Sequence, residues 1–198
     1  MSEMMRKISA GLEQAFAKGG FAEPSVEDLR DAAGVSLRTL YKYTPSRSEM
    51  VLAALEHRHR RYLARVFEGL PQEPAAALEA LLSRVGDWMA SETAHGCLFH
   101  AAVAADPASQ PLRELLERHK AEVAARAAAA TGLGSAGLGG DSVGADSDGA
   151  DSRGEGSGGA ETALLVIIEG LTQAWPLRGD EAVLAAKRLG RALQSATL

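Results

Sequence analysis

The chain has 198 residues, of which 46% are hydrophobic and 24% charged, a composition typical of a soluble globular protein with one or two domains. The longest apolar run in the C-terminal part, residues 163–168, is far shorter than the ~18 residues that a membrane-spanning helix needs. The single cysteine, Cys97, excludes an internal disulfide, and no apolar block follows Arg6 and Lys7 as it would in a secretory signal. We therefore expect a cytoplasmic protein that makes no membrane contact.

The net charge of −5 is unevenly distributed along the chain. Residues 1–68 contain 11 Lys and Arg against 9 Asp and Glu, whereas residues 69–198 contain 10 against 17. A basic first third in an acidic chain suits a module that contacts a polyanion while the remainder has another task.

Apolar residues recur every three or four positions along most of the chain, and the alternation typical of a strand is absent. The sequence therefore predicts an all-α fold of about nine helices. The first predicted helix ends at a pair of glycines, and its apolar face consists of Ile8, Leu12, Ala15 and Phe16.

The next segment predicts two short helices joined by a tight turn. Ser25 begins the first with the spacing of a capping box, and Gly34 ends it. Ser36 begins the second, in which a hydrophobic staple directs Leu40 inward. A helix, a four-residue turn containing Gly and a second short helix form a helix-turn-helix, here over about residues 25–44.

The outer face of the second short helix carries side chains that suit DNA. Arg38 can fork onto guanine and Thr39 can contact a base or a phosphate, while tyrosines, basic side chains and helix N-termini suit phosphates. The same spacing also fits a helical pair with a solvated basic face and buried tyrosines, so both interpretations stay open on the residues alone. The residues predicted to contact DNA are Ser25, Ser36, Leu37, Arg38, Thr39, Tyr41, Lys42, Tyr43 and Arg47.

The second half predicts further helices, with boundaries near Pro107, Pro111 and Pro176. Its bulky side chains suit either the walls of a small-molecule pocket or a plain core. These residues are Trp88, Met89, Phe99, His100, His119 and Trp175.

Residues 132–159 interrupt the helical pattern with 11 Gly and 5 Ser, and they offer too little apolar surface to offset the entropy of ordering them. We therefore expect a disordered connector. Asp146 and Asp148 resemble the start of a calcium loop, but the Gly and Glu that such a loop needs are replaced by Asp151 and Ser157.

Other chemistry is weakly indicated. His95, Cys97 and His100 have the spacing of a possible metal-ligand cluster, but no second pair of ligands accompanies them, and a buried thiol beside a helix start is the simpler interpretation. A redox-sensing Cys97 is disfavoured because the chain has no second cysteine. His57 and His59 lie two residues apart and therefore point to different faces. We expect no catalytic residues, no metal and no cofactor, and hence no enzyme.

The segment from Gly11 to Leu55 resembles the N-terminal domain of the TetR family of transcriptional regulators. Thr44 stands where the family usually has Phe, and Arg47 where it usually has Lys. The matching elements are Gly19-Gly20-Phe21, Ser25-Val26-Glu27-Asp28-Leu29, Ala32-Ala33-Gly34-Val35-Ser36, Thr39-Leu40-Tyr41-Lys42-Tyr43 and Arg47-Ser48-Glu49-Met50.

The resemblance implies a DNA-binding domain at residues 1–45 and a ligand-binding and dimerisation domain at residues 46–198. It implies a homodimer formed through the last two helices, around residues 164–175 and 182–193, and a pocket for a small-molecule effector at the six bulky residues above. The expected function is that of a repressor that binds double-stranded operator DNA and is released by a small apolar molecule. The alternative is a helical small-molecule-binding or interaction protein with a vestigial helix-turn-helix.

Overall fold

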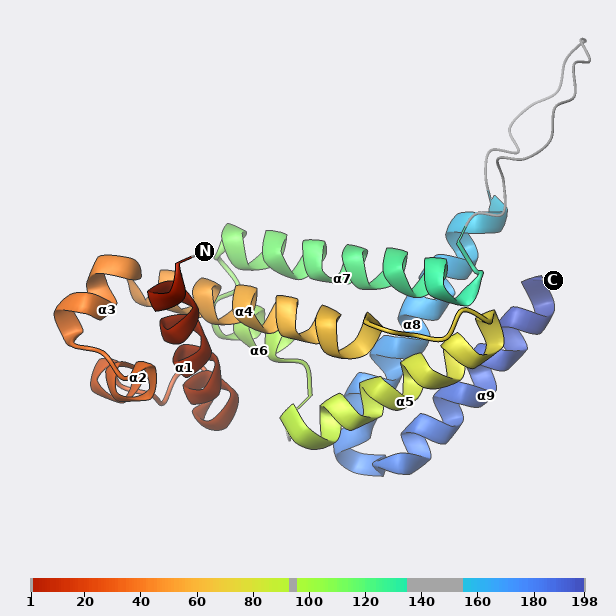
Figure 1. The fold of residues 1–198 in the computed structure, drawn as a ribbon, viewed down its shortest axis with the longest axis horizontal. Coiled ribbons are helices and arrows are strands. Elements are labelled where there is room, and N and C mark those ends of the chain that lie inside the picture. The colour runs from red at the N-terminus through yellow and green to blue at the C-terminus, as the bar shows by residue number, and fades with distance from the viewer. Residues whose placement is uncertain (1, 93–95, 135–154, 198) are drawn as a thin grey trace, which may run out of the picture.

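The computed structural model describes residues 2–92, 96–134 and 155–197. Over these residues the chain forms nine α-helices without a strand, which confirms the expected all-α fold (Figure 1). Within the same ranges no helix is long and apolar enough to cross a membrane. The helices are α1 (Glu3–Gly19), α2 (Val26–Ala33), α3 (Leu37–Tyr43), α4 (Arg47–Phe67), α5 (Pro74–Glu92), α6 (Leu98–Ala105), α7 (Gln110–Thr131), α8 (Glu155–Arg178) and α9 (Asp180–Thr197).

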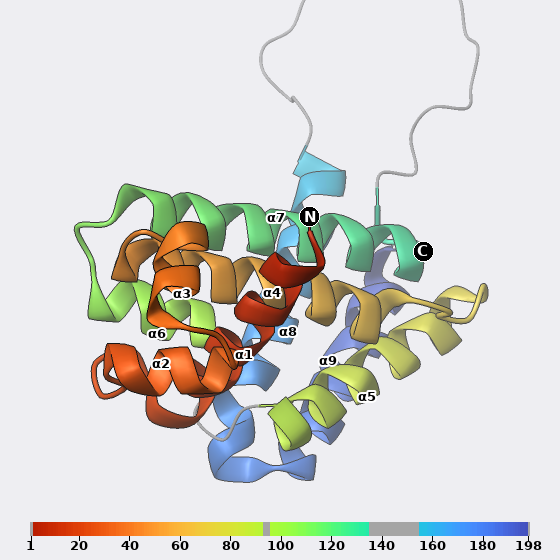
Figure 2. The same cartoon turned by 60° about the vertical axis from the view of Figure 1, so that its left-hand side comes forward.

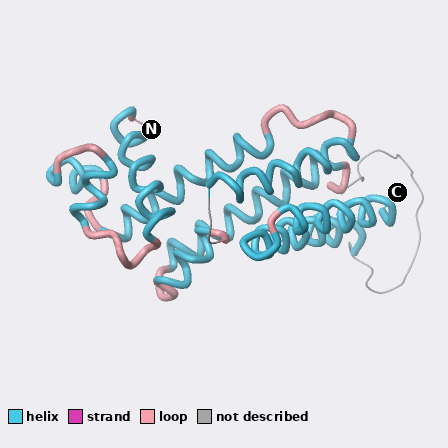
Figure 3. The backbone as a smooth tube through the Cα atoms, turned by 90° about the horizontal axis from the view of Figure 1, so that it is seen from below, coloured by secondary structure: helices cyan, strands magenta, loops and turns pink. Residues whose placement is uncertain are grey.

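The first three helices form a head at one end of the molecule, opposite the C-terminus (Figure 3). The predicted capping box of α2 is present: Ser25 Oγ accepts from Asp28 N at 3.1 Å, and Ser25 N donates to Asp28 Oδ2 at 2.8 Å. Gly34 ends α2 in a left-handed conformation with φ 60°, which a residue with a side chain rarely adopts. The predicted helix-turn-helix is therefore formed by α2 and α3.

A glycine allows α1 to lie directly against α2. A Cβ atom placed on Gly11 would overlap with the carbonyl oxygen of Ala32 and the Cα of Ala33. Lys7, one turn earlier on α1, donates from Nζ to the carbonyl oxygen of Gly34 at 2.8 Å. The helix-turn-helix is therefore held to α1 by backbone proximity as well as by the apolar core.

The long helix α4 connects the head to the rest of the molecule, with α5 and α7 packed along it (Figures 1 and 2). Its first half contributes Met50, Ala54 and Leu55 to the hydrophobic core of the head. Its second half contributes Tyr62 and Val66 to a second core built with α5, α7, α8 and α9. One rigid element thus belongs to both cores.

The core of the head extends beyond the first four helices. Leu98, Phe99 and Ala102 of α6, together with Leu112 and Leu115 of α7, belong to the same buried cluster as the head residues. The short α6 therefore packs against the head from the side of the second domain.

The predicted connector is described only at its two ends. Gly132 ends α7 with φ 71°, Leu133 is buried in the second core, and α8 begins at Glu155. Residues 135–154 lie outside the described residues, so the expected disorder stays a prediction. Pro176, predicted as a helix boundary, instead lies inside the last turn of α8.

Replacing Gly11 with alanine should lower the free energy of unfolding by about 2 kcal/mol, because the new Cβ forces α1 away from α2. Urea unfolding followed by circular dichroism measures this change. The control is Gln14→Ala on the exposed side of the same helix, which should change the free energy by less than about 0.5 kcal/mol. Equal stability of the two variants would show that the helices separate without strain.

Candidate functional site

The basic residues of α3 lie on its outer face, where Lys42 Nζ is 5.9 Å from the centre of the Tyr43 ring. Leu40 is fully buried, whereas Arg38 and Lys42 are exposed and Tyr41 is 44% exposed. The helix begins with a side-chain cap, in which Ser36 Oγ accepts from the backbone nitrogen of the third helical residue at 3.1 Å. This arrangement fixes the backbone of α3 and leaves long polar side chains available to a polyanion.

Thr44 and Arg47, at the end of the helix-turn-helix, form hydrogen bonds to backbone carbonyl oxygens within the head. Arg47 Nη2 donates to the carbonyl oxygen of Phe21 at 2.8 Å, and its guanidinium lies 5.8 Å from the centre of the Phe16 ring. Thr44 is buried, and its hydroxyl donates to the carbonyl oxygen of Leu40 at 2.9 Å. The threonine therefore closes the end of α3 where the family usually has an aromatic ring. The contacts of Arg47 turn its charge toward the head rather than outward.

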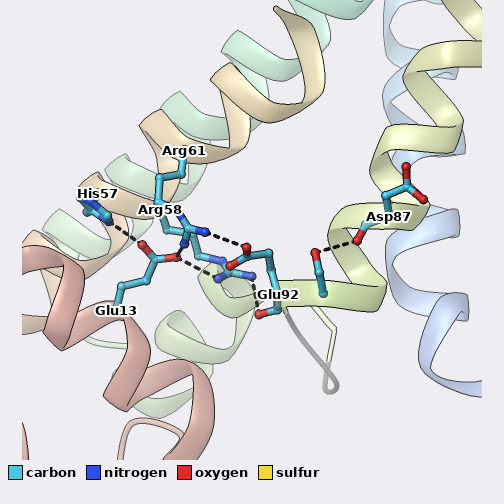
Figure 4. Close-up of polar contacts among 7 residues, drawn as sticks. Glu13, His57, Arg58, Arg61, Asp87 and Glu92 are labelled. Carbon is cyan, nitrogen blue, oxygen red and sulfur yellow. Dashed lines mark hydrogen bonds and ion pairs between the residues drawn. The ribbon is translucent and has the colours of Figure 1, made fainter. Parts of the chain in front are cut away.

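A buried carboxylate joins the head to the second domain. Glu13 of α1, with a side chain only 3% exposed, lies between three bases on α4 (Figure 4). Its carboxylate oxygens are 2.6 Å from His57 Nδ1, 3.1 Å from Arg58 Nη1 and 2.8 Å from Arg61 Nη1. Arg61 also pairs with Glu92 of α5 at 2.7 Å. The network thus connects α1, α4 and α5.

The same arginines border an aromatic wall. Arg58 and Arg61 lie 4.9 Å and 5.4 Å from the centre of the Trp88 ring, within the range of a cation–π contact. Tyr62 meets Trp88 edge to face at 5.3 Å. A continuous set of contacts therefore runs from the head through α4 to the interior of the second domain.

A small cavity of about 20 Å³ lies behind this wall. Four of the six residues predicted to bind an effector line it: Trp88, Met89, Phe99 and His119. The other two predicted residues do not line it. His100 is exposed and contacts Gln173, and Trp175 packs at the edge of the second core.

Several polar residues of the cavity were not predicted as effector contacts. Lys120 and Glu169 form an ion pair at 2.6 Å on its wall, and Arg58, Tyr62 and Cys97 also line it. Glu169 had a signal in the sequence, because it is the first charged residue after the apolar run of residues 163–168. His95, considered with Cys97 as a metal ligand, lies outside the described residues.

A pair of histidines connects α4 and α7 beside the cavity. His59 Nδ1 and His119 Nδ1 are 3.0 Å apart, and His59 Nε2 lies 3.1 Å from Glu122 Oε2. His119 also stacks on Phe99 with ring centres 4.0 Å apart. Burial, followed by the charges of Lys120 and His59, lowers the pKa of His119 to about 2, so the ring is neutral in the folded protein at pH 7.

The described fold is that of an all-α protein with an N-terminal helix-turn-helix and a separate helical second domain. Residues 8–54 match the family profile described as "Bacterial regulatory proteins, tetR family". No curated protein sequence matches the chain significantly. The chain thus has the N-terminal domain of the TetR family, and the resemblance found in the sequence is confirmed.

Solved structures share the fold over nearly the whole chain. A TetR-family transcriptional regulator from Streptomyces coelicolor is 19% identical with a TM-score of 0.74, and the match covers 99% of this chain and 90% of that one. A TetR transcription regulator from Haloarcula marismortui is 16% identical with a TM-score of 0.70, covering 99% and 98%. The multidrug binding protein EbrR, complexed with imidazole, is 17% identical with a TM-score of 0.60, covering 96% and 93%.

Replacing Glu13 with alanine should lower the free energy of unfolding by about 3–5 kcal/mol, because it leaves the buried Arg58 without its carboxylate partner. Chemical denaturation measures the loss. The control is Glu56→Ala, which breaks surface pairs with Arg60 and Arg118 and should cost less than about 1 kcal/mol. Similar losses for both variants would show that the buried network contributes little.

The low pKa of His119 predicts a pH-dependent stability. Below the ordinary histidine pKa of about 6.5, the unfolded chain binds a proton that the folded chain does not. The free energy of unfolding therefore decreases as the pH is lowered. At pH 5 the free energy of unfolding should have lost about 2 kcal/mol from this group, and His119→Gln should remove that loss. Urea unfolding at pH 7 and pH 5 compares the two proteins. An unchanged pH dependence in the variant would contradict the assignment.

Proposed function

We propose that the chain is a cytoplasmic, non-enzymatic transcriptional repressor that binds operator DNA through α3 and leaves it when a small molecule enters the second domain. The observation that carries this proposal is the exposed polar face of the capped α3, where Arg38 and Lys42 lie beside the buried Leu40. An arginine on such a face can donate two hydrogen bonds to one guanine, which gives base preference as well as affinity.

We propose that two copies associate through α8 and α9. These helices carry four of the large hydrophobic residues that are exposed in the described single chain, namely Val166, Leu177, Leu184 and Leu189 at 63%, 85%, 54% and 59% exposure. Exposed apolar side chains on adjacent helices suit a two-fold interface. A dimer of this kind occupies two half-sites when its recognition helices lie about 34–36 Å apart.

The effector is proposed to act by widening the cavity beside Trp88 and Phe99. The present volume of about 20 Å³ accommodates about one water molecule, so an organic compound enters only when the surrounding helices move. Two of these helices reach the head: α4 carries the bases that bind Glu13, and α6 contributes Phe99 to the core of the head. Reducing DNA affinity 100-fold requires a differential binding free energy of about 2.7 kcal/mol.

Replacing Arg38 with alanine should weaken binding to the preferred operator by about 1–3 kcal/mol and change binding to random DNA much less. Operators selected from random DNA by the purified protein supply the probe, and fluorescence anisotropy measures affinity. The control is Arg65→Ala, an exposed arginine near the far end of α4. Equal losses on operator and random DNA would exclude base contact by Arg38. Absence of any selected sequence would favour the vestigial helix-turn-helix.

Replacing Leu189 with glutamate should raise the dimer dissociation constant by about tenfold or more, because the interface would then bury an unpaired carboxylate. Sedimentation velocity over a concentration series measures this change. The matched control is Met4→Glu, which alters an exposed apolar residue of α1 at 39% exposure. An unchanged dissociation constant for Leu189→Glu, or the same increase for Met4→Glu, would place the interface elsewhere.

A further inference from the structure

A thiol and an ammonium group meet at one end of the small cavity. Lys120 Nζ lies 3.5 Å from Cys97 Sγ and donates to Glu169 Oε1 at 2.6 Å. Cys97 is half-buried and lines the cavity, and it is the single cysteine of the sequence. Cys97 thus differs from a cysteine that only fills space in a core, because a cation contacts its sulfur.

The surroundings of Cys97 favour the thiolate. Burial raises the pKa of the thiol, but the neighbouring His100 side chain and the Lys120 ammonium together lower it more, so the pKa lies below its ordinary value. The thiol in turn raises the pKa of His100. A thiolate beside an ammonium group is the reactive form of cysteine.

A second feature of the cavity points to a carbonyl ligand. Tyr62 lines the cavity and is 9% exposed, yet its hydroxyl has no hydrogen-bond partner among the described residues. Buried tyrosine hydroxyls usually have such a partner. Burial, followed by the negative charges of Glu169 and Cys97, raises the pKa of Tyr62, so the phenol keeps its proton and remains a donor. An acceptor oxygen within the cavity would satisfy it.

We propose that Cys97 covalently captures small α,β-unsaturated carbonyl compounds in this cavity. The Sγ thiolate forms a bond to the β-carbon, and the π electrons of the carbon–carbon double bond move toward the carbonyl oxygen, giving an enolate. Tyr62 donates a hydrogen bond to that oxygen, and a water molecule transfers a proton to the α-carbon. The products are a thioether and a hydroxide ion that the solvent neutralises, and no oxidant, reductant or leaving group is involved.

Two features favour the addition of a small carbonyl compound to Cys97 over oxidation of the thiol: the number of cysteines and the lining of the cavity. A disulfide within the chain is impossible with one cysteine, whereas addition needs a single thiol. Met89, Phe99 and Val123 provide apolar walls for the carbon skeleton, and the volume of about 20 Å³ restricts its size. A bound adduct exceeds that volume, so it must displace part of the walls, which α4, α5, α6, α7 and α8 form together. That the adduct acts as the effector rests on the function proposed above.

The first test is the rate of adduct formation with methyl vinyl ketone, followed by intact-protein mass spectrometry across pH. We expect one adduct per chain, absent in Cys97→Ser, and a rate at pH 7 about tenfold above that of free cysteine. The rate should rise through an apparent pKa below that of free cysteine, and Lys120→Met should move this pKa upward. A rate and a pH profile equal to those of free cysteine would overturn the proposal.

The second test separates Tyr62 from a structural role. Tyr62→Phe removes a hydroxyl that makes no hydrogen bond to a described residue, so thermal stability should be unchanged. The rate of addition should fall about tenfold, while the pKa of the Cys97 thiol stays the same. Tyr41→Phe, on the surface of α3, is the matched control and should leave the rate unchanged. An unaltered rate in Tyr62→Phe would remove the tyrosine from the proposed step.

The third test measures operator affinity of the adduct, with butanone as the saturated control that cannot react. Loss of affinity in the adduct but not in the butanone sample supports regulation by capture. An adduct that binds operator unchanged would overturn its role as effector while the capture itself stands. A protein that forms the adduct but binds no DNA would overturn the proposed repressor and leave the chemistry of Cys97 intact.

Discussion

The arrangement of the molecule depends on a carboxylate that is buried between two helices. Removing Glu13 from water is unfavourable unless cations replace its hydration, and all three of its bases lie on α4. The head therefore has one orientation against α4 in which this charge is neutralised. Because Arg58 and Arg61 also lie over Trp88, the orientation of the head is connected to the walls of the cavity. The same two arginines thus contact both the buried carboxylate of the head and the ring of Trp88.

Local features of the fold could be predicted from the sequence, because their causes lie within a few residues. The capping box at Ser25, the cap at Ser36 and the inward position of Leu40 each depend on spacings of three or four residues, and the structure confirms them. The contacts of the junction and the cavity could not be predicted. Glu13 and Arg58 are 45 residues apart, and Lys120 and Glu169 are 49 residues apart, so only the packed helices bring them together.

The position of Arg47 illustrates the same limit at short range. Its charge and its place after α3 suggest a phosphate contact, which stays a prediction, whereas the hydrogen bond from its guanidinium to the carbonyl oxygen of Phe21 could not be predicted. That oxygen belongs to the turn that follows the end of α1, 26 residues earlier in the chain. The predicted pocket has a similar limit, because His100 and Trp175 have suitable side chains but are not among the residues that line the cavity.

The small volume of the cavity affects the apparent affinity of a ligand as well as the size of the molecules that fit. An effector that binds only an opened form has an apparent dissociation constant equal to its intrinsic constant divided by the fraction of molecules that are open. Substitutions at tightly packed positions such as Met89 or Val123 alter that fraction without touching DNA. In the function proposed here, the concentration threshold of the response is therefore adjustable through packing density, and a more sensitive regulator would at the same time be a less stable protein.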